Sequence, residues 1–438
     1  MKLLVIAHTP PPHHGQSYMV QLMLAGFGGD CRKPRRPDSA NSGGSGVGPE
    51  TPRSFGIECY HVNARLSQTL QDIGELRMGK FILLLGYCLQ AIWCRFRYGV
   101  KTLYYIPAPG KRSAVYRDWM VMLVCRPFFK RIILHWHAAG LAKWLETVVS
   151  MRVRSLTYRL MKKADLSIVL SRYNWADAEK LFSRRIRVVS NGIPDPCPDF
   201  ERTLLSRRHA RFAALRKLLS GQPLDAEQVK GAGSETQVVT VLYLAHCTRE
   251  KGLFDTLAGV ALARERLAGQ RFPVSVRLHV AGTFVTTAEK EEFERLVKES
   301  GRADSVQYFG FVSGERKNQL LREADVFCFP TYYANENQPV NIIEAMAFGL
   351  PILTTRWRSI PELFPAHYPG LVDVRSPEQI ANVLPALMTG EAGNGLRESF
   401  LRGFTLERHL AGLAEAFTQI DQAPPATEAD FAIPAFPQ

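Results

Sequence analysis

Residues 336–351 read ENQPVNIIEAMAFGLP, and this stretch carries the sharpest local signal in the chain. Its middle has an apolar helical pattern. Pro339 suits the first helical turn, and Gly349 suits the left-handed position after the last turn. Apolar runs at 326–329 and 352–354 flank this helix and read as buried strands. Strand, helix and strand in this order indicate a parallel sheet with crossover helices.

The same alternation extends through most of the chain. Further strands are expected in the second half at 238–244, 274–281 and 306–309, with helices at 253–266, 288–300 and 317–323. Strands are expected in the first half at 3–7, 102–106, 131–135, 166–170 and 187–189, and the first helix should begin near Ser17. Two runs of this kind predict two doubly wound, Rossmann-like α/β domains.

Turn formers and composition mark the domain boundaries. A first domain is expected at 1–198, a linker with one charged helix at 199–236, and a second domain at 237–405. A C-terminal helix at 406–422 should pack on either domain, and the Pro/Ala-rich tail at 423–438 should be disordered. Residues 28–54 are rich in Gly, Ser, Pro and Arg and predict a mobile surface loop.

Charge is unevenly placed along the chain. The formal charge is +14, yet residues 1–200 hold 29 Lys or Arg and 13 Asp or Glu, a balance of +16. A basic half-molecule favours an anionic partner, either nucleic acid or a membrane surface, although it can also serve solubility alone. The 14-residue apolar run 81–94 falls short of the ~20 residues that span a bilayer, which predicts a core or interfacial helix.

Cysteines and the N-terminus point to a reducing cytosol. The eight cysteines form no C-x-x-C pair and no zinc-like set with histidine, so free thiols are expected and no metal site is predicted. The first residues, MKLLVIAH, lack the long apolar run and cleavage site of a signal peptide. They read better as a buried first strand.

The start of the 340–348 helix is a candidate anion site. The amides of Val340 and Asn341 should point out of the helix N-terminus, where phosphate binds readily. Glu336 lies just before the helix and can hold a sugar hydroxyl, and Glu344 is spaced to face the ligand side. A capped amphipathic helix with an incidental pair of glutamates has the same spacing.

Two more segments at strand ends carry candidate groups. His246, Arg249, Lys251 and Gly252 follow the 238–244 strand, where a lysine beside a glycine can approach a diphosphate; a surface lysine at a helix start is the alternative. His135 and His137 form an H-x-H without a third metal ligand. We expect them to point to opposite faces, with His135 buried and His137 facing the site.

Residues 236–365 resemble glycosyltransferase family 4, a large group of retaining GT-B enzymes. The family's E-x7-E and E-A-M-A-x-G-x-P motifs match Glu336, Glu344 and residues 344–351, and its E-K-G matches residues 250–252. Its G-x-V, A-D-V and I-P-E segments match residues 310–312, 324–326 and 360–362. The first domain matches only in its glycine loop, its His-containing strand end and the N-G at 191–192.

The resemblance implies a GT-B fold, with two Rossmann-like domains facing a central cleft, and a metal-independent hexosyltransferase that needs no cofactor. Lys251 would neutralise the leaving diphosphate, helped by the amides of Val340 and Asn341. Glu336 and His137 would contact the donor sugar. The remaining implied contacts are Glu344 to the ribose, Val312 to the base, and Gly15 and Gln16 closing over the phosphates.

Two departures from the family pattern stand out. The arginine before E-K-G is replaced by His246, so the diphosphate contact passes to His246 or Arg249. The usual F-G before the helix is Gln338-Pro339, a variant that removes one amide donor.

The predicted function is transfer of a sugar from a nucleotide-diphosphate donor to a glycan or lipid-linked acceptor in cell-surface polysaccharide or glycolipid synthesis. The enzyme is expected to be cytoplasmic and peripheral on an anionic membrane surface, with no nucleic-acid partner. A GT-B sugar-nucleotide epimerase, a phosphorylase and a degenerate nucleotide-sugar-binding protein are the alternatives. A Rossmann oxidoreductase is weaker, because no G-x-G-x-x-G follows the first strand.

Overall fold

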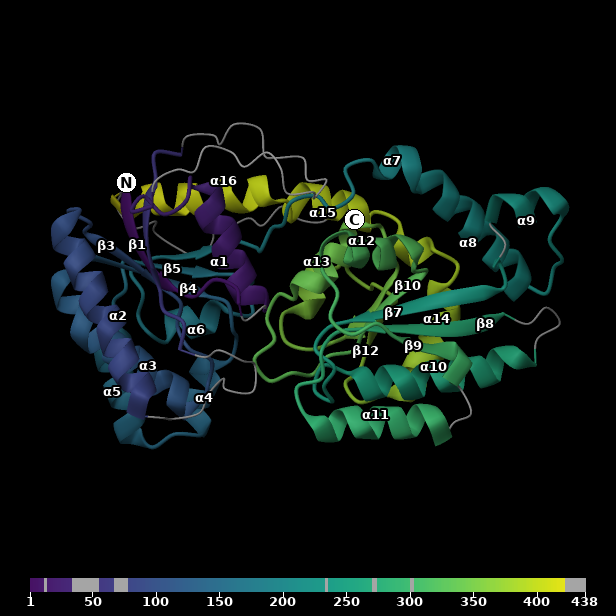
Figure 1. Ribbon diagram of the computed structural model, residues 1–438, viewed down its shortest axis with the longest axis horizontal. Coiled ribbons are helices and arrows are strands. Elements are labelled where there is room, and N and C mark those ends of the chain that lie inside the picture. The colour runs from purple at the N-terminus through teal and green to yellow at the C-terminus, as the bar shows by residue number, and fades with distance from the viewer. Residues whose placement is uncertain are drawn as a thin grey trace. The chain divides into compact units, whose positions relative to one another are not determined.

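The computed structural model describes residues 1–11, 14–33, 55–66, 78–232, 235–269, 274–299 and 303–421. The chain divides into two compact units, one made of Met1–Ile193 with Leu406–Gln438 and the other of Pro194–Thr405. Each unit holds a six-stranded parallel sheet with helices on both faces (Figure 1). The prediction of two doubly wound α/β domains is therefore confirmed.

The first sheet has the strand order β2-β1-β3-β4-β5-β6. Its strands are β1 (Lys2–Ala7), β2 (Glu58–Asn63), β3 (Thr102–Tyr105), β4 (Arg131–Trp136), β5 (Leu166–Val169) and β6 (Ile186–Val188). From Leu3 onward every residue of β1 is buried, as expected for a strand covered on both faces.

Helices from distant parts of the chain cover the two faces of the first sheet. One core cluster joins the sheet to α1 (Gly15–Gly26) and α16 (Leu406–Thr418). The other joins it to α2 (Met78–Arg97), α3 (Arg112–Cys125) and α5 (Met151–Met161). The short elements η1 (Arg126–Phe128), α4 (Leu141–Thr147) and α6 (Trp175–Glu179) complete this unit.

The second sheet has the order β12-β11-β10-β7-β8-β9. Its strands are β7 (Val238–Leu244), β8 (Ser275–Ala281), β9 (Val306–Tyr308), β10 (Val326–Phe329), β11 (Ile352–Thr355) and β12 (Leu371–Val372). In Figure 1, α10 (Leu253–Ala268) and α11 (Thr287–Glu299) lie below this sheet, and α12 (Gly314–Glu323) and α13 (Val340–Ala347) lie above it. The helices α14 (Pro377–Leu387) and α15 (Leu396–Gly403) follow β12.

The unit boundaries differ from those expected from sequence. The chain changes unit after Ile193, within the turn-rich segment that was predicted to end at 198. Residues 199–236 are not a linker with one helix. They form α7 (Phe200–Thr203), α8 (Leu205–Leu219) and α9 (Ala226–Ala232), and α8 packs into the second unit through the buried Phe212 and Leu215. The 423–438 tail and most of the 28–54 loop lie outside the described residues.

The C-terminal helix α16 belongs to the first unit, which settles a choice that sequence left open. Its Leu413 and Phe417 are fully buried in the core cluster shared with β1 and α1. His409 of α16 is 2% exposed, and its Nδ1 donates to the carbonyl of Ser190 at 2.7 Å. The chain therefore returns to complete the core of the unit in which it began.

His409 and His135 bury titratable rings in this core. His135 is 1% exposed and is hydrogen-bonded to the Tyr104 hydroxyl, with its ring stacked 6.3 Å from that of His409. Burial lowers the pKa of His409 to about 4 and holds the pKa of His135 well below its ordinary value. Both rings are therefore neutral at pH 7.

Acidification should destabilise the first unit. The unfolded chain binds protons at these histidines near pH 6.5 while the folded chain does not, so the free energy of unfolding falls as pH drops from about 6.5 toward 4. Each ring contributes up to about 1.4 kcal/mol per pH unit in that window. Denaturant melts at pH 7.5, 6.0 and 5.0 measure the slope. His409→Gln should make the free energy of unfolding depend less steeply on pH, whereas replacement of the exposed His209 by Gln should not. Equal slopes in the two variants would show that His409 does not cause the loss of stability in acid.

Candidate active site

The candidate site of the second unit lies where the strand order reverses. The chain builds outward from β7 through β8 and β9, and then returns to place β10 on the other side of β7. Ligands of open α/β sheets bind at the carboxyl ends of the strands at such a point. The segments leaving β7 and β10 here are residues 245–252 and 330–339, which contain five of the twelve site residues predicted from sequence.

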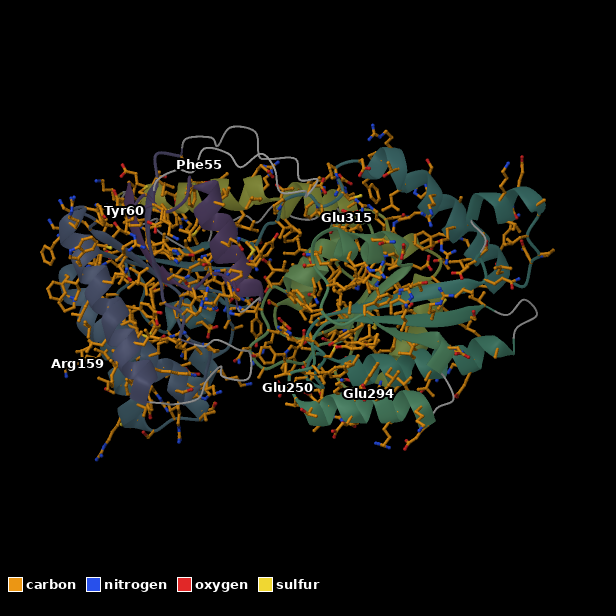
Figure 2. The ribbon with its side chains drawn as sticks, in the orientation of Figure 1. Phe55, Tyr60, Arg159, Glu250, Glu294 and Glu315 are labelled. Carbon is orange, nitrogen blue, oxygen red and sulfur yellow. The ribbon has the colours of Figure 1, made fainter. Side chains whose placement is uncertain are left out.

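Gly252 allows the two segments to approach each other closely. Its φ is +83°, and a Cβ at this position would stand 2.3 Å from the carbonyl oxygen of Pro330. Beside it the Tyr332 amide donates to the Glu250 carbonyl at 2.8 Å. Figure 2 labels Glu250 in the segment that follows β7. Both the backbone angle and the space at residue 252 therefore require glycine.

A lysine and a glutamate from the two segments form the centre of the site. Lys251 Nζ lies 2.6 Å from Glu336 Oε2, and the two side chains are only 18% and 10% exposed. The Thr331 hydroxyl, which is fully buried, lies 3.1 Å from the same carboxylate oxygen. The ring of Tyr333 lies under the ammonium group, 4.5 Å from Nζ. The family resemblance placed Lys251 and Glu336 in one site, and the structure brings the two side chains together.

The start of α13 lies at the same edge of the sheet. The Asn341 side chain donates to the Leu244 carbonyl at the end of β7, at 2.8 Å, and accepts from the Ile342 amide at 2.9 Å. Within the described part of the chain, the amides of Val340 and Asn341 have no hydrogen-bond acceptor. These two N–H groups at the positive end of the helix can bind a phosphate oxygen.

The residues that begin and end α13 follow the sequence pattern, except that Pro339 is shifted by one position. Gly349 has φ +60°, so the left-handed position expected there is confirmed. Pro339 is the N-cap residue, one position before the first helical residue rather than within the first turn.

Glu344 and Val312 occupy separate positions in the second unit. The buried Glu344 carboxylate pairs with Lys317 of α12. Val312 is half-buried in the loop between β9 and α12. Neither makes a recorded contact to the Lys251–Glu336 pair, so their predicted roles toward ribose and base remain predictions.

His246 and Arg249 have different surroundings. His246 is close enough to Lys251 and Glu336 for their charges to act on it, and burial is the largest cause that lowers its pKa, followed by the Lys251 charge. The Arg249 guanidinium instead pairs with Glu292 of α11 and lies 4.4 Å from the Phe254 ring centroid. Of the two residues, His246 is therefore the one beside the site centre.

Gly15 and Gln16 begin α1 in the first unit. His14 is the N-cap, and its side chain accepts from the Ser17 amide at 3.3 Å. A nitrogen of the same ring lies 2.6 Å from Nε2 of His8, so one ring donates to the other. The described residues offer no acceptor to the amides of Gly15 and Gln16.

The two histidines of the H-x-H do not point to opposite faces. Their rings lie 4.2 Å apart, and His137 is half-buried just beyond the end of β4. The expectation was wrong because residues two apart in a strand share a face. Burial, with smaller effects of His409 and His14, lowers the pKa of His137 to about 3. His137 is thus a neutral hydrogen-bonding group at physiological pH.

Three contributors were missed by sequence reasoning: Thr331, Tyr333 and Lys317. Thr331 follows β10 by two residues, and a hydroxyl at the carboxyl end of a central strand was a usable signal. Nothing in the local sequence marked Lys317 as the partner of Glu344, since strand β10 and the loop after it separate α12 from α13 along the chain. Among the residues described, no group of three or more His, Cys, Asp or Glu is placed to hold a metal ion.

Comparison with known proteins agrees with this geometry. Residues 225–400 match the family "Glycosyl transferases group 1". The amylovoran biosynthesis glycosyltransferase AmsK of Erwinia amylovora is 29% identical over 166 residues, 36% of this chain and 37% of AmsK. The putative colanic acid biosynthesis glycosyltransferase WcaL of Escherichia coli K12 is 26% identical over 202 residues, 43% of this chain and 47% of WcaL. The aligned region thus spans less than half of either relative.

Solved structures match over nearly the whole chain. Sucrose-phosphate synthase from Thermosynechococcus elongatus aligns with a TM-score of 0.60 and 19% identity, covering 96% of this chain and 99% of the synthase. HepE of Anabaena in complex with UDP-glucose aligns with a TM-score of 0.58 and 15% identity, covering 96% and 100%. The class defined by this fold is that of the GT-B proteins.

Within that class, residues 225–400 of the chain are similar to the group 1 glycosyl transferases. The resemblance seen in the sequence motifs is therefore confirmed.

Replacing Gly252 should disturb the site more than replacing another left-handed glycine. Gly252→Ala adds a clash with the Pro330 carbonyl to the backbone strain, whereas Gly221 has φ +72° and nothing within 4 Å of a Cβ. Strain alone costs about 1–3 kcal/mol, and crowding adds about 1–3 kcal/mol at residue 252. Denaturant melts of both alanine variants compare the costs. Equal destabilisation would show that the close approach is unimportant.

Proposed function

We propose that the protein is a retaining glycosyltransferase that moves a sugar from a nucleotide-diphosphate donor to a glycan or lipid-linked acceptor. The observation that carries the proposal is the Lys251–Glu336 pair at the switch point of the second sheet, beside the open N-terminus of α13. The relatives named for amylovoran and colanic acid synthesis support a role in cell-surface polysaccharide or glycolipid synthesis. The complex of HepE with UDP-glucose supports a nucleotide-sugar donor.

Stabilisation of the leaving diphosphate is the first task of the site. As the bond from the sugar to the diphosphate breaks, negative charge grows on the phosphate oxygens. Lys251 and the amides of Val340 and Asn341 are preorganised donors for that charge in a partly buried place, where such interactions are strong. In this proposal they supply the electrostatic role that a metal ion has in other transferases, so hexosyl transfer proceeds without metal or cofactor.

Glu336 is proposed to hold the hydroxyls of the donor sugar. Its carboxylate accepts hydrogen bonds only, so it suits hydroxyl donors. The Lys251 ammonium at 2.6 Å and the Thr331 hydroxyl at 3.1 Å fix its orientation. We assign Thr331 a positioning role. Sugar and diphosphate groups are then held by adjacent side chains, consistent with front-face attack and retention.

His246 takes the place of the family arginine in a different chemical form. Because burial and the Lys251 charge lower its pKa, the imidazole is neutral at pH 7 and can donate one hydrogen bond to a phosphate oxygen. We propose this contact for His246 and not for Arg249, whose guanidinium is engaged by Glu292. Lys251 is then the main positive side chain at the diphosphate.

The remaining residues keep the roles that the resemblance implies. We propose Glu344 for the ribose, Val312 for the base, His137 for the donor sugar, and Gly15 with Gln16 for closure over the phosphates. His137 would act as a neutral hydrogen-bonding group, since its pKa of about 3 leaves it uncharged.

We propose that the enzyme acts at the cytoplasmic face of a membrane. A lipid-linked acceptor is presented there, and the +16 balance of residues 1–200 favours an anionic surface over nucleic acid, for which no recognised module is present.

Loss of either central charge should impair transfer. With a donor first identified by melting shifts against a panel of nucleotide sugars, Glu336→Ala and Lys251→Ala should each lower kcat/KM more than tenfold, about 1.4 kcal/mol of transition-state stabilisation. Arg266→Ala, which removes an exposed ion pair with Glu378, is the control and should stay within twofold. Near-normal turnover of either site variant would refute the assignment.

Chelation should leave turnover nearly unchanged. If Lys251 and the α13 amides stabilise the diphosphate, activity in excess EDTA should remain within about twofold of the untreated enzyme, because no metal bond to the phosphates is lost. Initial rates with and without EDTA give the answer. Complete loss that Mn²⁺ or Mg²⁺ restores would overturn this part of the proposal.

A further inference from the structure

Helix α2 has its larger apolar side chains on the outside. Its inner face packs into the core of the first unit through Leu84, Cys88, Ala91 and Cys94, each at most 3% exposed. Its outer face exposes a stripe of large side chains at helical spacing. These are Ile82 at 71%, Leu85 at 42%, Leu89 at 57%, Trp93 at 55% and Phe96 at 66%. A helix that only covered a sheet would carry polar residues there.

The apolar surface continues beyond the helix. The ring of Phe96 lies 6.1 Å from that of Phe128 in η1, which is itself 41% exposed. Arg95 of α2 donates to the Phe128 carbonyl at 2.9 Å, which holds the two elements together. Single exposed apolar residues are ordinary, but a contiguous stripe marks an interaction site. We call Ile82, Leu85, Leu89, Trp93, Phe96 and Phe128 the α2 outer face.

The surroundings of the α2 outer face are basic. Residues 78–131 contain ten Lys or Arg and a single acid, Asp118, which is fully buried and paired with Arg117. Lys101 and Lys130 are exposed and adjacent, since the Lys130 amide donates to the Lys101 carbonyl at 3.0 Å. An apolar stripe with tryptophan, set among cations, matches the headgroup region of an anionic leaflet. A second copy of the chain would bring like charges together.

The basic character reaches the neighbouring helices of the same unit. Helix α5 packs on α3, which packs on α2, and α5 contains three arginines and no acid. Arg159, labelled in Figure 2, lies on the outer side of α5 and is exposed. Met151 at the start of α5 is 78% exposed. The unit thus presents cations and apolar side chains on several adjacent helices.

The length of α2 raises the question of a membrane span. Sequence placed a 14-residue apolar run here, but the helix has 20 residues, and by length and composition its segment Gly79–Arg97 is long and apolar enough to cross a membrane. If the helix crossed a bilayer, the buried side chains of Cys88 and Ala91 would have to leave the core that they share with Leu4 of β1. The helix therefore lies along a surface and does not cross it.

We propose that the α2 outer face docks into the headgroup–acyl boundary of an anionic lipid leaflet. Trp93 and the neighbouring apolar side chains enter the boundary, while Lys101, Lys130 and Arg97 meet lipid phosphates. Only the choice of the cytoplasmic leaflet rests on the proposed function. The docking itself can be measured without donor or acceptor.

Vesicle flotation tests the surface. The full chain should float with vesicles containing phosphatidylglycerol at low salt, stay behind with pure phosphatidylcholine, and be largely released at 0.5 M NaCl, because screening shortens to a few Å. Leu89→Ser with Phe96→Ser should lower the partition coefficient at least tenfold. Val229→Ser with Leu401→Ser, exposed apolar residues of the second unit, is the matched control and should leave it unchanged.

Charge reversal provides a second matched pair. Lys101→Glu with Lys130→Glu should lower partitioning at least tenfold, whereas Lys230→Glu with Lys298→Glu changes net charge equally in the second unit and should lower it less than threefold. Equal losses in both pairs would mean that net charge alone drives binding and would overturn the docking surface.

The fluorescence of Trp93 can show whether this side chain enters the membrane. Trp93 is exposed, while the other five tryptophans are buried or half-buried. Vesicles with brominated acyl chains should quench its fluorescence, and Trp93→Phe should abolish that quenching while flotation persists. Flotation without Trp93 quenching, or a change in oligomeric state of the Leu89→Ser, Phe96→Ser variant, would assign the face to another partner. An unchanged donor-induced melting shift in that variant separates failed docking from failure of the transferase proposal.

Discussion

The close approach of two backbone segments organises the second unit. Strands β7 and β10 are adjacent in the sheet and buried on both faces, so polar side chains can stand only where the strands end. Gly252 lets the segment after β7 reach the Pro330 carbonyl, and this contact places Lys251 against Glu336. The start of α13 is fixed at the same edge by Asn341. The Lys251–Glu336 pair thus depends on one glycine, and the position of the helix N-terminus depends on Asn341.

Charge balance explains why this arrangement is stable without a ligand. Each of the two carboxylates of the E-x7-E pattern has an ammonium partner from another element, Lys251 for Glu336 and Lys317 for Glu344. A buried carboxylate without such a partner would cost several kcal/mol. A bound diphosphate would share Lys251 with Glu336 and add the α13 amides as donors. Under the proposed function, the diphosphate would therefore meet side chains that already hold their positions.

The first unit combines the same sheet architecture with a different surface. Its inner positions on α2 are small residues such as Cys88 and Ala91, which let the helix lie close to the sheet, and the bulky residues such as Trp93 are left outside. Hydropathy along the sequence cannot separate these two faces because both are apolar. The run at 81–94, which was predicted to form a core or interfacial helix, proves to be part of a 20-residue helix with an apolar side turned outward.

Local patterns and family motifs were sufficient for the fold class and for much of the candidate site. Strands such as β7 and β10 were predicted with their observed bounds, because a continuous apolar run between turn formers has few other solutions. The resemblance to the family's motifs grouped Lys251 with Glu336. The sequence analysis missed β2 and β12, and it interpreted α7–α9 as a linker with one helix. Short or charged segments carry a weak local pattern, and the elements they pack against in the folded chain decide their structure. The face shared by His135 and His137 follows from strand geometry and was predictable. The partner of Glu344 and the return of α16 to the first unit were not. These depend on contacts between residues far apart in the chain, which no local pattern encodes.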